Sequence, residues 1–360
     1  MNKLVIIGNG FELAHELPTS YKDFILWHIN NVFKLPKNNR ESDLIKIDSN
    51  LQYSSVLKIE EYKEIREYND DQYWFRIEGK NDFIDEILEH IDLFNWVDIE
   101  SLYYSKVVHF CRKKNDKRYL DINLSTRNKL ETILDLNICF KQIKDHLIIY
   151  LEGLNKTNNK SLKDIRSILV NDLNCFAEPE KIKFLNFNYT TTIENYCRYK
   201  DETLDVNYIH GQFDSEKNQI IFGYGDETDE YYEKLENLKD NEFLKHMKSF
   251  AYLQTPNYKE LFKFLDQEQL GEEKREKFDV YIMGHSCGVS DRLLFTHIFE
   301  HPLLNSVKLY YYERPDGTND FYEKTQELSR HFRKDAKHKM RKCIVPFNES
   351  KPLPQFKPQN

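Results

Sequence analysis

The chain has 360 residues, of which 40% are hydrophobic and 31% are charged, so it can bury one large core or two to three smaller ones. The formal net charge of −8 gives no overall positive field of the kind that attracts nucleic acid. The six cysteines form no Cys-x-x-Cys pair. This spacing argues against a structural zinc site and a disulfide framework, and it favours a reducing, cytoplasmic setting.

The first elements, within residues 1–34, are predicted to be a buried strand and a helix. The strand at residues 3–8 begins almost at once, which leaves no room for a signal peptide. Thr19 or Ser20 then provides an N-cap for a helix whose apolar face starts at Phe24. No apolar run in the chain approaches the roughly 18 residues that a membrane helix needs, so no membrane partner is expected.

Residues 35–175 differ in composition from the segments on either side and are predicted to form a mostly helical insertion or subdomain. Polar stretches rich in Asn and Asp precede two long amphipathic segments, NDFIDEILEHIDLF and KLETILDLNICFKQIKDHLIIYL. Between them lie Trp96, Asp98 and Glu100. Paired acids can act in acid–base catalysis, but an ordinary amphipathic helix with Trp96 packed inward is the favoured interpretation.

From about residue 181, strands and helices alternate again. The predicted strands are KIKFLNFN, VNYIHG, QIIFGYG, FDVYIMGHS and SVKLYYY, and a helix follows the first, fourth and fifth of them. This alternation indicates an α/β fold built on a Rossmann-like, doubly wound, mostly parallel sheet. We therefore predict a core made of residues 1–34 and 176–350, interrupted by the helical insertion and followed by a tail at 351–360.

Four loops are expected to meet at one edge of this sheet, because ligands of open α/β sheets bind beyond the carboxyl ends of the strands. In the first loop, Gly8, Asn9, Gly10 and Phe11 lead from a strand into a helix, where glycines permit a close approach to a pyrophosphate. Leu13 replaces the third glycine of the dinucleotide fingerprint, and no P-loop pattern follows. On this motif alone, a tight strand–helix turn is as well supported as ligand binding.

The second and third loops carry an amide and an imidazole. Asn188 follows a strand and precedes three threonines, so a helix N-cap is favoured, with orientation of a water or a ribose hydroxyl as the alternative. His210 ends another strand and precedes Gly211. Histidine changes charge near neutral pH, and its place on the expected ligand edge favours acid–base chemistry.

The fourth loop, GHSCGVSD, again follows a buried strand. Gly284 and Ser286 permit a second close approach to a ligand, and Asp291 falls in the first turn of the next helix. The same letters match the G-x-S-x-G nucleophile elbow of serine hydrolases. The histidines at 297 and 301 follow Ser286 too soon for that fold, and the later ones lie in charged helical sequence, so nucleotide binding is favoured.

Together these segments resemble a known family. LVIIGNGFELAHELPTSYKDF, FLNFNYTTTIE, IHGQ, IIFGYGDE and MGHSCGVSDRLLF are similar to segments of the AbiH-like family of bacteriophage abortive-infection proteins. The resemblance spans both ends of the chain, and WVDIE in the middle is similar as well. It implies a role in phage defence.

The same segments are more distantly similar to sirtuin-like NAD-consuming domains of bacterial defence systems. Residues 8–10, 187–190, 210–211 and 284–286 stand where that pattern has Gly-Ala-Gly, Thr-Asn-Tyr-Asp, His-Gly and Gly-Tyr/Thr-Ser. The chain departs from it at Asn9 and Thr190, and it lacks the sirtuin zinc cysteines. The resemblance therefore implies an NAD pocket without a metal and without peptide deacetylase activity.

The resemblance implies an effector that binds NAD and hydrolyses its nicotinamide–ribose bond. Asn188 would orient the water or the ribose and His210 would accept a proton, while NAD would contact Gly8, Asn9, Gly10, Phe11, Gly284, Ser286 and Asp291. The alternative is a sensor that binds NAD or ADP-ribose without turnover. An enzyme acting on nucleic acid is disfavoured by the acidic charge. A phage-derived trigger and further copies of the chain are the other candidate partners.

Overall fold

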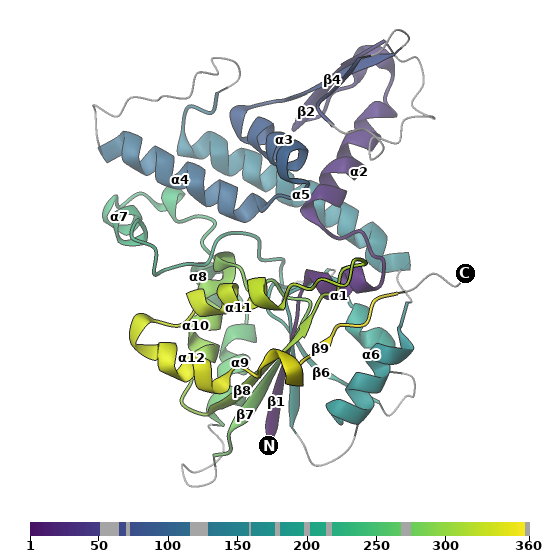
Figure 1. Cartoon of the computed structure of the whole chain (residues 1–360). Coiled ribbons are helices and arrows are strands. Elements are labelled where there is room, and N and C mark those ends of the chain that lie inside the picture. Colours follow the sequence, from purple (N-terminus) through teal and green to yellow (C-terminus); the bar gives the residue numbers. More distant parts are fainter. Residues whose placement is uncertain are drawn as a thin grey trace.

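The computed structural model describes residues 1–50, 65–69, 73–115, 129–157, 160–176, 181–197, 202–213, 218–267 and 275–356. At its centre lies a six-stranded sheet in the order β6-β5-β1-β7-β8-β9 (Figure 1). All of its strand pairs are parallel. The strands are β1 (Asn2–Ile7), β5 (Ile182–Asn186), β6 (Asp205–Tyr208), β7 (Phe278–Met283), β8 (Leu304–Tyr311) and β9 (Lys351–Pro352).

This strand order confirms the predicted Rossmann-like α/β fold. From β1 the chain adds β5 and β6 on one side, and then β7, β8 and β9 on the other, which is the 3-2-1-4-5-6 order of doubly wound sheets. The direction in which successive strands are added to the sheet reverses between β1 and β7. β1 is buried on both faces: Leu4 and Ile6 pack in one apolar cluster, and Val5 and Ile7 pack in another. Its unbroken apolar run is therefore that of a central parallel strand.

Helices cover both faces of the sheet (Figure 1). One face packs against α9 (Asn257–Asp266), α10 (Arg292–Phe299), α11 (Phe321–Arg330) and α12 (Lys337–Cys343). The other packs against α1 (Asn9–Ala14), α6 (Lys163–Ser167) and the 3₁₀ helix η4 (Thr192–Tyr196). The α6 segment lies within the residues predicted to form the insertion, and β9 lies within the predicted tail.

A second unit, here called the helical lobe, lies against the end of the sheet where β1 leads into α1 (Figure 1). It consists of α2 (Tyr21–Phe33), α3 (Asp82–Phe94), α4 (Ile99–Asn115), α5 (Ile133–Thr157) and an antiparallel sheet of β2 (Ile45–Ser49), β4 (Trp74–Gly79) and β3 (Glu67–Asn69). This sheet was not predicted from the sequence. The predicted boundaries assign α2 to the core, but its apolar face packs in the cluster of the lobe.

The start of α2 depends on residues that are close in sequence, and it was predicted correctly. Of the two predicted N-caps, Thr19 and Ser20, it is Ser20 that caps α2, and it forms a reciprocal capping box with Asp23. QIIFGYG was wrongly predicted as a strand: Tyr224 forms only an isolated bridge with Met247, because the amide of Gly223 donates to a glutamate of the helical lobe. Across the described ranges, no helix has the length and apolar character needed to cross a bilayer.

Candidate functional site

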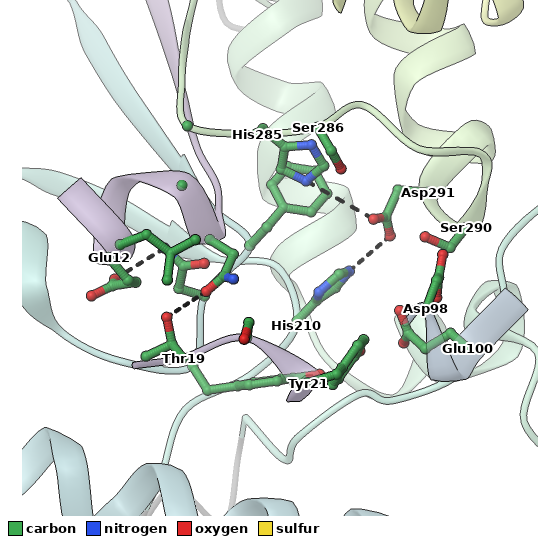
Figure 2. Close-up of a pocket in the computed structure, with 18 of the residues that line it drawn as sticks. Glu12, Thr19, Tyr21, Asp98, Glu100, His210, His285, Ser286, Ser290 and Asp291 are labelled. Atoms are coloured by element: carbon green, nitrogen blue, oxygen red, sulfur yellow. Dashed lines mark hydrogen bonds and ion pairs between the residues drawn. The ribbon is translucent and has the colours of Figure 1, made fainter. Parts of the chain in front are cut away.

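A cavity of about 380 Å³ lies between the sheet and the helical lobe, at the reversal between β1 and β7 (Figure 2). All four predicted loops contribute to it. On the sheet side its walls include Asn9, Gly10, Glu12, Phe187, Asn188, His210, Gly284, His285, Ser286, Ser290 and Asp291. From the lobe and the turn before it come Thr19, Ser20, Tyr21, Trp96, Asp98, Glu100, Leu147 and Leu151.

The two glycine loops pack against each other. The amide of Gly8 donates to the carbonyl of Met283 at 3.1 Å, and that of Gly10 donates to the carbonyl of Gly284 at 2.7 Å. A Cβ atom on Gly8 would lie 2.5 Å from His285 Cα, and one on Gly10 would lie 2.7 Å from the Gly284 oxygen. The glycines are therefore needed for the contact between the loops, and the amides of Gly8 and Gly10 are used within the protein.

Of the four residues predicted in the first loop, Asn9 and Gly10 line the cavity. Asn9 is exposed, and its Oδ1 atom accepts a hydrogen bond of 2.5 Å from the Thr19 hydroxyl. It does not cap α1, whose N-cap is Gly8. Phe11 is fully buried beneath the loop, with its ring 4.8 Å from that of His15. Gly8 and Phe11 thus build the loop, and Asn9 presents its side chain at the cavity.

Asn188 joins the second loop to the first. Its buried amide donates to the Gly8 carbonyl at 3.1 Å and to Oε1 of Glu12 at 3.0 Å. Glu12 is only 1% exposed, and the Thr192 hydroxyl donates to its other oxygen. Burial raises the pKa of Glu12, although the hydrogen bonds from Thr192 and Asn188 oppose the shift. Glu12 was not predicted from the sequence, where its only signal is an acidic residue two positions after the second glycine.

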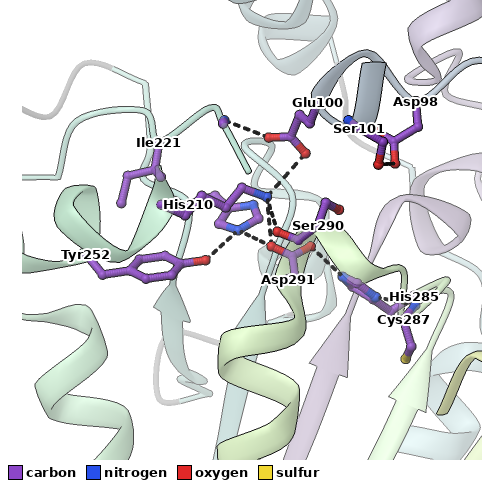
Figure 3. Close-up of polar contacts among 12 residues, drawn as sticks. Asp98, Glu100, Ser101, His210, Ile221, Tyr252, His285, Cys287, Ser290 and Asp291 are labelled. Carbon is purple, nitrogen blue, oxygen red and sulfur yellow. Dashed lines mark hydrogen bonds and ion pairs between the residues drawn. The ribbon is translucent and has the colours of Figure 1, made fainter. Parts of the chain in front are cut away.

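The buried carboxylate of Asp291 is the centre of a polar network (Figure 3). Its Oδ1 atom lies 2.8 Å from the ammonium of Lys248 and 3.1 Å from Nε2 of His210. Lys248 also donates to Glu100 at 3.2 Å, so the network crosses from the sheet into the helical lobe. The Glu100 side chain in turn accepts from the amide of Gly223 at 2.9 Å. Lys248 was not predicted from the sequence as part of the site.

The charges in this network depend on one another. Burial alone would raise the pKa of Asp291, but the charges of Lys248 and His210 outweigh it and hold that pKa well below its usual range. Burial would lower the pKa of Lys248, but Asp291 and Glu100 raise it to about 12. Burial raises the pKa of Glu100 to about 7, even with Lys248 beside it. Asp291 and Lys248 are therefore charged at neutral pH, while Glu100 titrates near it.

The two histidines of the cavity are held in place by neighbours. His210 has its Nε2 atom 3.1 Å from Asp291 and 3.2 Å from the Tyr252 hydroxyl, and burial together with the charge of Lys248 lowers its pKa. Burial lowers the pKa of His285 to about 3, so its ring is neutral at pH 7. Because the amide of Cys287 donates to Nδ1 of His285, the proton of that ring lies on Nε2, which is 4.0 Å from Asp291.

The predicted inward packing of Trp96 is wrong. Its side chain is 62% exposed, because it lies in the connection after α3, where Asn95 adopts a left-handed conformation and ends the helix. Asp98 accepts hydrogen bonds from the amide and hydroxyl of Ser101, at 3.1 and 2.7 Å, in the first turn of α4. Glu100, taken from the sequence as an ordinary helical residue, is instead buried in the Asp291 network.

The fold and the site define a Rossmann-type α/β protein with a cavity at the β1/β7 reversal, covered by a helical lobe. Asp291, Glu100 and His210 line this cavity, and Lys248 joins Asp291 to Glu100 behind them. The family model for bacteriophage abortive infection AbiH matches residues 4–312. The chain belongs to the AbiH family, which confirms the resemblance seen in the sequence and supports a role in phage abortive infection. No curated protein matches the chain. The similarity to sirtuin-like domains stays a prediction.

Proposed function

We propose that the chain is an abortive-infection effector that binds NAD in the cavity and hydrolyses the nicotinamide–ribose bond. The observation that carries the proposal is the place of the cavity, at the β1/β7 reversal where doubly wound sheets bind dinucleotides. Its volume of about 380 Å³ falls within the roughly 300–1,000 Å³ of small-molecule sites. Family membership supports the defence role, and the four loops support the ligand.

Three polar side chains at the wall of the cavity suit the pyrophosphate of a dinucleotide. The amides of Gly8 and Gly10 donate within the protein, so we assign the pyrophosphate to Asn9, Ser286 and the ammonium of Lys324, which all line the cavity. Lys324 is held there by a hydrogen bond of 3.0 Å to the His285 carbonyl. Lys324, which also lies 3.4 Å from Asp320, and the two neutral polar groups would offset part of the negative charge of the pyrophosphate.

Hydrolysis requires stabilisation of a ribosyl cation and removal of a proton from water. The bond between C1′ and the pyridinium nitrogen breaks with its electron pair going to nicotinamide, while water forms a new bond to C1′ and gives up a proton. The ionised Asp291 carboxylate supplies negative charge in the cavity. The Nε2 atom of His210 donates to this carboxylate, so the Nδ1 atom of His210 is the proposed proton acceptor. Asn188 acts by holding Gly8 and Glu12 in position.

The test is release of nicotinamide and ADP-ribose from NAD by the purified chain, with and without extract of phage-infected cells. His210→Ala and Asp291→Asn are expected to lower the rate by about 100- to 10,000-fold, the range of one acid–base group. His338→Ala, an exposed histidine on α12, is the matched control. No release under either condition, together with constant cellular NAD during phage growth arrest, would contradict the hydrolase proposal.

A nucleotide sensor is the second candidate, and one observation favours it. Nε2 of His210 faces Asp291 and Tyr252, so that nitrogen is already engaged within the protein. In a sensor the same cavity would bind NAD or ADP-ribose, and the Lys248–Glu100 contact would pass the event to the helical lobe. Calorimetric binding of NAD without any product on prolonged incubation would select the sensor over the enzyme.

A further inference from the structure

A second group of chemically active side chains lies within the helical lobe, outside the cavity. His28 of α2, Asp43 of the turn before β2 and His146 of α5 come together although they are far apart in sequence. One ring nitrogen of each histidine and one carboxylate oxygen all lie within 4.8 Å of one another. Among the described residues of the chain, these three form the one such group of histidine, cysteine and carboxylate side chains.

The distances within this group suit coordination by a small ion. Nε2 of His146 is 2.7 Å from Oδ1 of Asp43, and the rings of His28 and His146 meet edge to face with centroids 4.5 Å apart. Zinc binds imidazole nitrogen and carboxylate oxygen at about 2.0–2.2 Å, which places tetrahedral ligands about 3.4 Å from one another. The His146–Asp43 separation is shorter than that value and no separation within the group exceeds 4.8 Å, so the three ligand atoms are close enough to converge on one ion.

The surroundings of the group also suit an ion. Nε2 of His28 lies 2.9 Å from the hydroxyl of Ser42, which provides a further oxygen beside the three side chains. The Asp43 side chain is 38% exposed and that of His146 is 26% exposed, which gives an ion a path from solvent.

We propose that His28, Asp43 and His146 form a binding site for a divalent transition-metal ion of the zinc class. Two imidazoles and one carboxylate are ligands that such ions accept, and the fourth position is left to water or to Ser42. The ion would cross-link α2, the turn before β2 and α5. Tyr21 on α2 and Leu147 on α5 line the cavity, so the ion would fix two parts of its lobe-side wall.

The test measures metal binding by the full chain after treatment with a chelator. Zn²⁺ is titrated by calorimetry, and Co²⁺ by the visible absorption bands that report a four-coordinate nitrogen and oxygen environment. One ion per chain and a higher melting temperature with Zn²⁺ are expected. His146→Ala and Asp43→Asn should each weaken binding by more than about 100-fold, since even indirect partners of metal ligands matter 10- to 100-fold. His338→Ala should bind as the parent does.

Three results would overturn the proposal. The first is absence of Zn²⁺ and Co²⁺ binding to the parent chain, which leaves a plain His–Asp hydrogen bond. The second is binding that persists in His146→Ala and Asp43→Asn. The third is an intense sulfur-to-cobalt charge-transfer band, which would place the ion on cysteine thiols. These measurements do not involve NAD, so their outcome is independent of the proposed hydrolase activity. The Co²⁺ spectrum of the parent chain tests the metal site even if one variant fails to fold.

Discussion

Lys248 and Asp291 form an ion pair at 2.8 Å in which the lysine side chain is fully buried and the aspartate side chain is 8% exposed. The lysine belongs to α8 (Lys248–Ala251), and the aspartate ends the 3₁₀ helix η8 (Val289–Asp291) before α10. Because Lys248 also contacts Glu100 of α4, one ammonium joins the sheet core to the helical lobe across the wall of the cavity. Any change in this pair should therefore affect stability as well as the site.

We expect Lys248→Met to lower the free energy of unfolding by about 3–5 kcal/mol, because it leaves buried carboxylates without their partner. Urea unfolding at pH 7.5 measures the change. Adding Asp291→Asn to this variant should recover part of the loss, since the unpaired charge is then removed. Lys245→Met, which removes an exposed lysine paired with Glu242, should have little effect. A loss no larger than that of the control would contradict the proposed role of the pair.

Gly10→Ala should destabilise the chain by about 1–3 kcal/mol, because the added methyl group would meet the backbone of Gly284. The two glycine loops would have to separate, and NAD binding should weaken with them. Gly153→Ala is the matched control: Gly153 lies within α5 and no atom lies within 4 Å of the added Cβ. That variant should gain about 0.5–1 kcal/mol. Equal effects at both positions would argue against the loop contact.

Asn188→Ala should cost about 1–3 kcal/mol, because Glu12 and the Gly8 carbonyl each lose a buried hydrogen-bond donor. Asn188→Asp should be worse at pH 7.5 than at pH 5, since a second carboxylate would then face Glu12. Thermal unfolding at both pH values separates the two variants. Asn195→Ala, on the 3₁₀ helix η4 that follows Asn188 and partly exposed, serves as the control. A pH-independent loss in Asn188→Asp would show that repulsion is not the cause.

The stability of the chain should fall in acid because of buried neutral histidines. Burial lowers the pKa of His331 to about 4 in the folded chain, whereas an unfolded histidine titrates near 6.5. Between these two pH values the unfolded state binds more protons than the folded state. The free energy of unfolding therefore decreases as the pH falls, by about 1.4 kcal/mol per pH unit for this residue. His246, with a pKa lowered to about 4 by burial, should add to the effect.

The measurement is urea unfolding of the parent and of His331→Gln between pH 7.5 and pH 4.5. Glutamine can still donate to the Cys287 carbonyl, which His331 contacts at 2.7 Å. The variant should therefore show a shallower dependence on pH, while the exposed His338→Gln should keep the slope of the parent. Parallel curves for the parent and His331→Gln would rule out this residue as a source of acid lability.

Features that depend on near neighbours in sequence were predictable. The apolar run of β1 predicted a buried strand, and Thr19 or Ser20 before an apolar helical face predicted the start of α2. The four loops were placed correctly at one cavity, because the carboxyl ends of parallel strands meet at the same edge of a sheet. The edge of the site therefore followed from strand–helix alternation alone.

Features that depend on distant partners were not predictable. Lys248 pairs with a residue 43 positions later and with another 148 positions earlier, and no local pattern marks either contact. The same holds for Trp96 and Glu12. Trp96 is exposed because α3 ends just before it, and Glu12 is buried because Asn188 of the second loop packs against it.

The sequence by itself thus determined the parallel α/β core, the edge at which the loops meet and the family. Only the tertiary structure decided what the loops do there. The glycines of the first loop approach Gly284 and His285, and the charges in the cavity come from side chains of both units. The reason is physical: backbone periodicity is set by neighbours in the chain, whereas the burial and pairing of a charge depend on which distant segments pack around it.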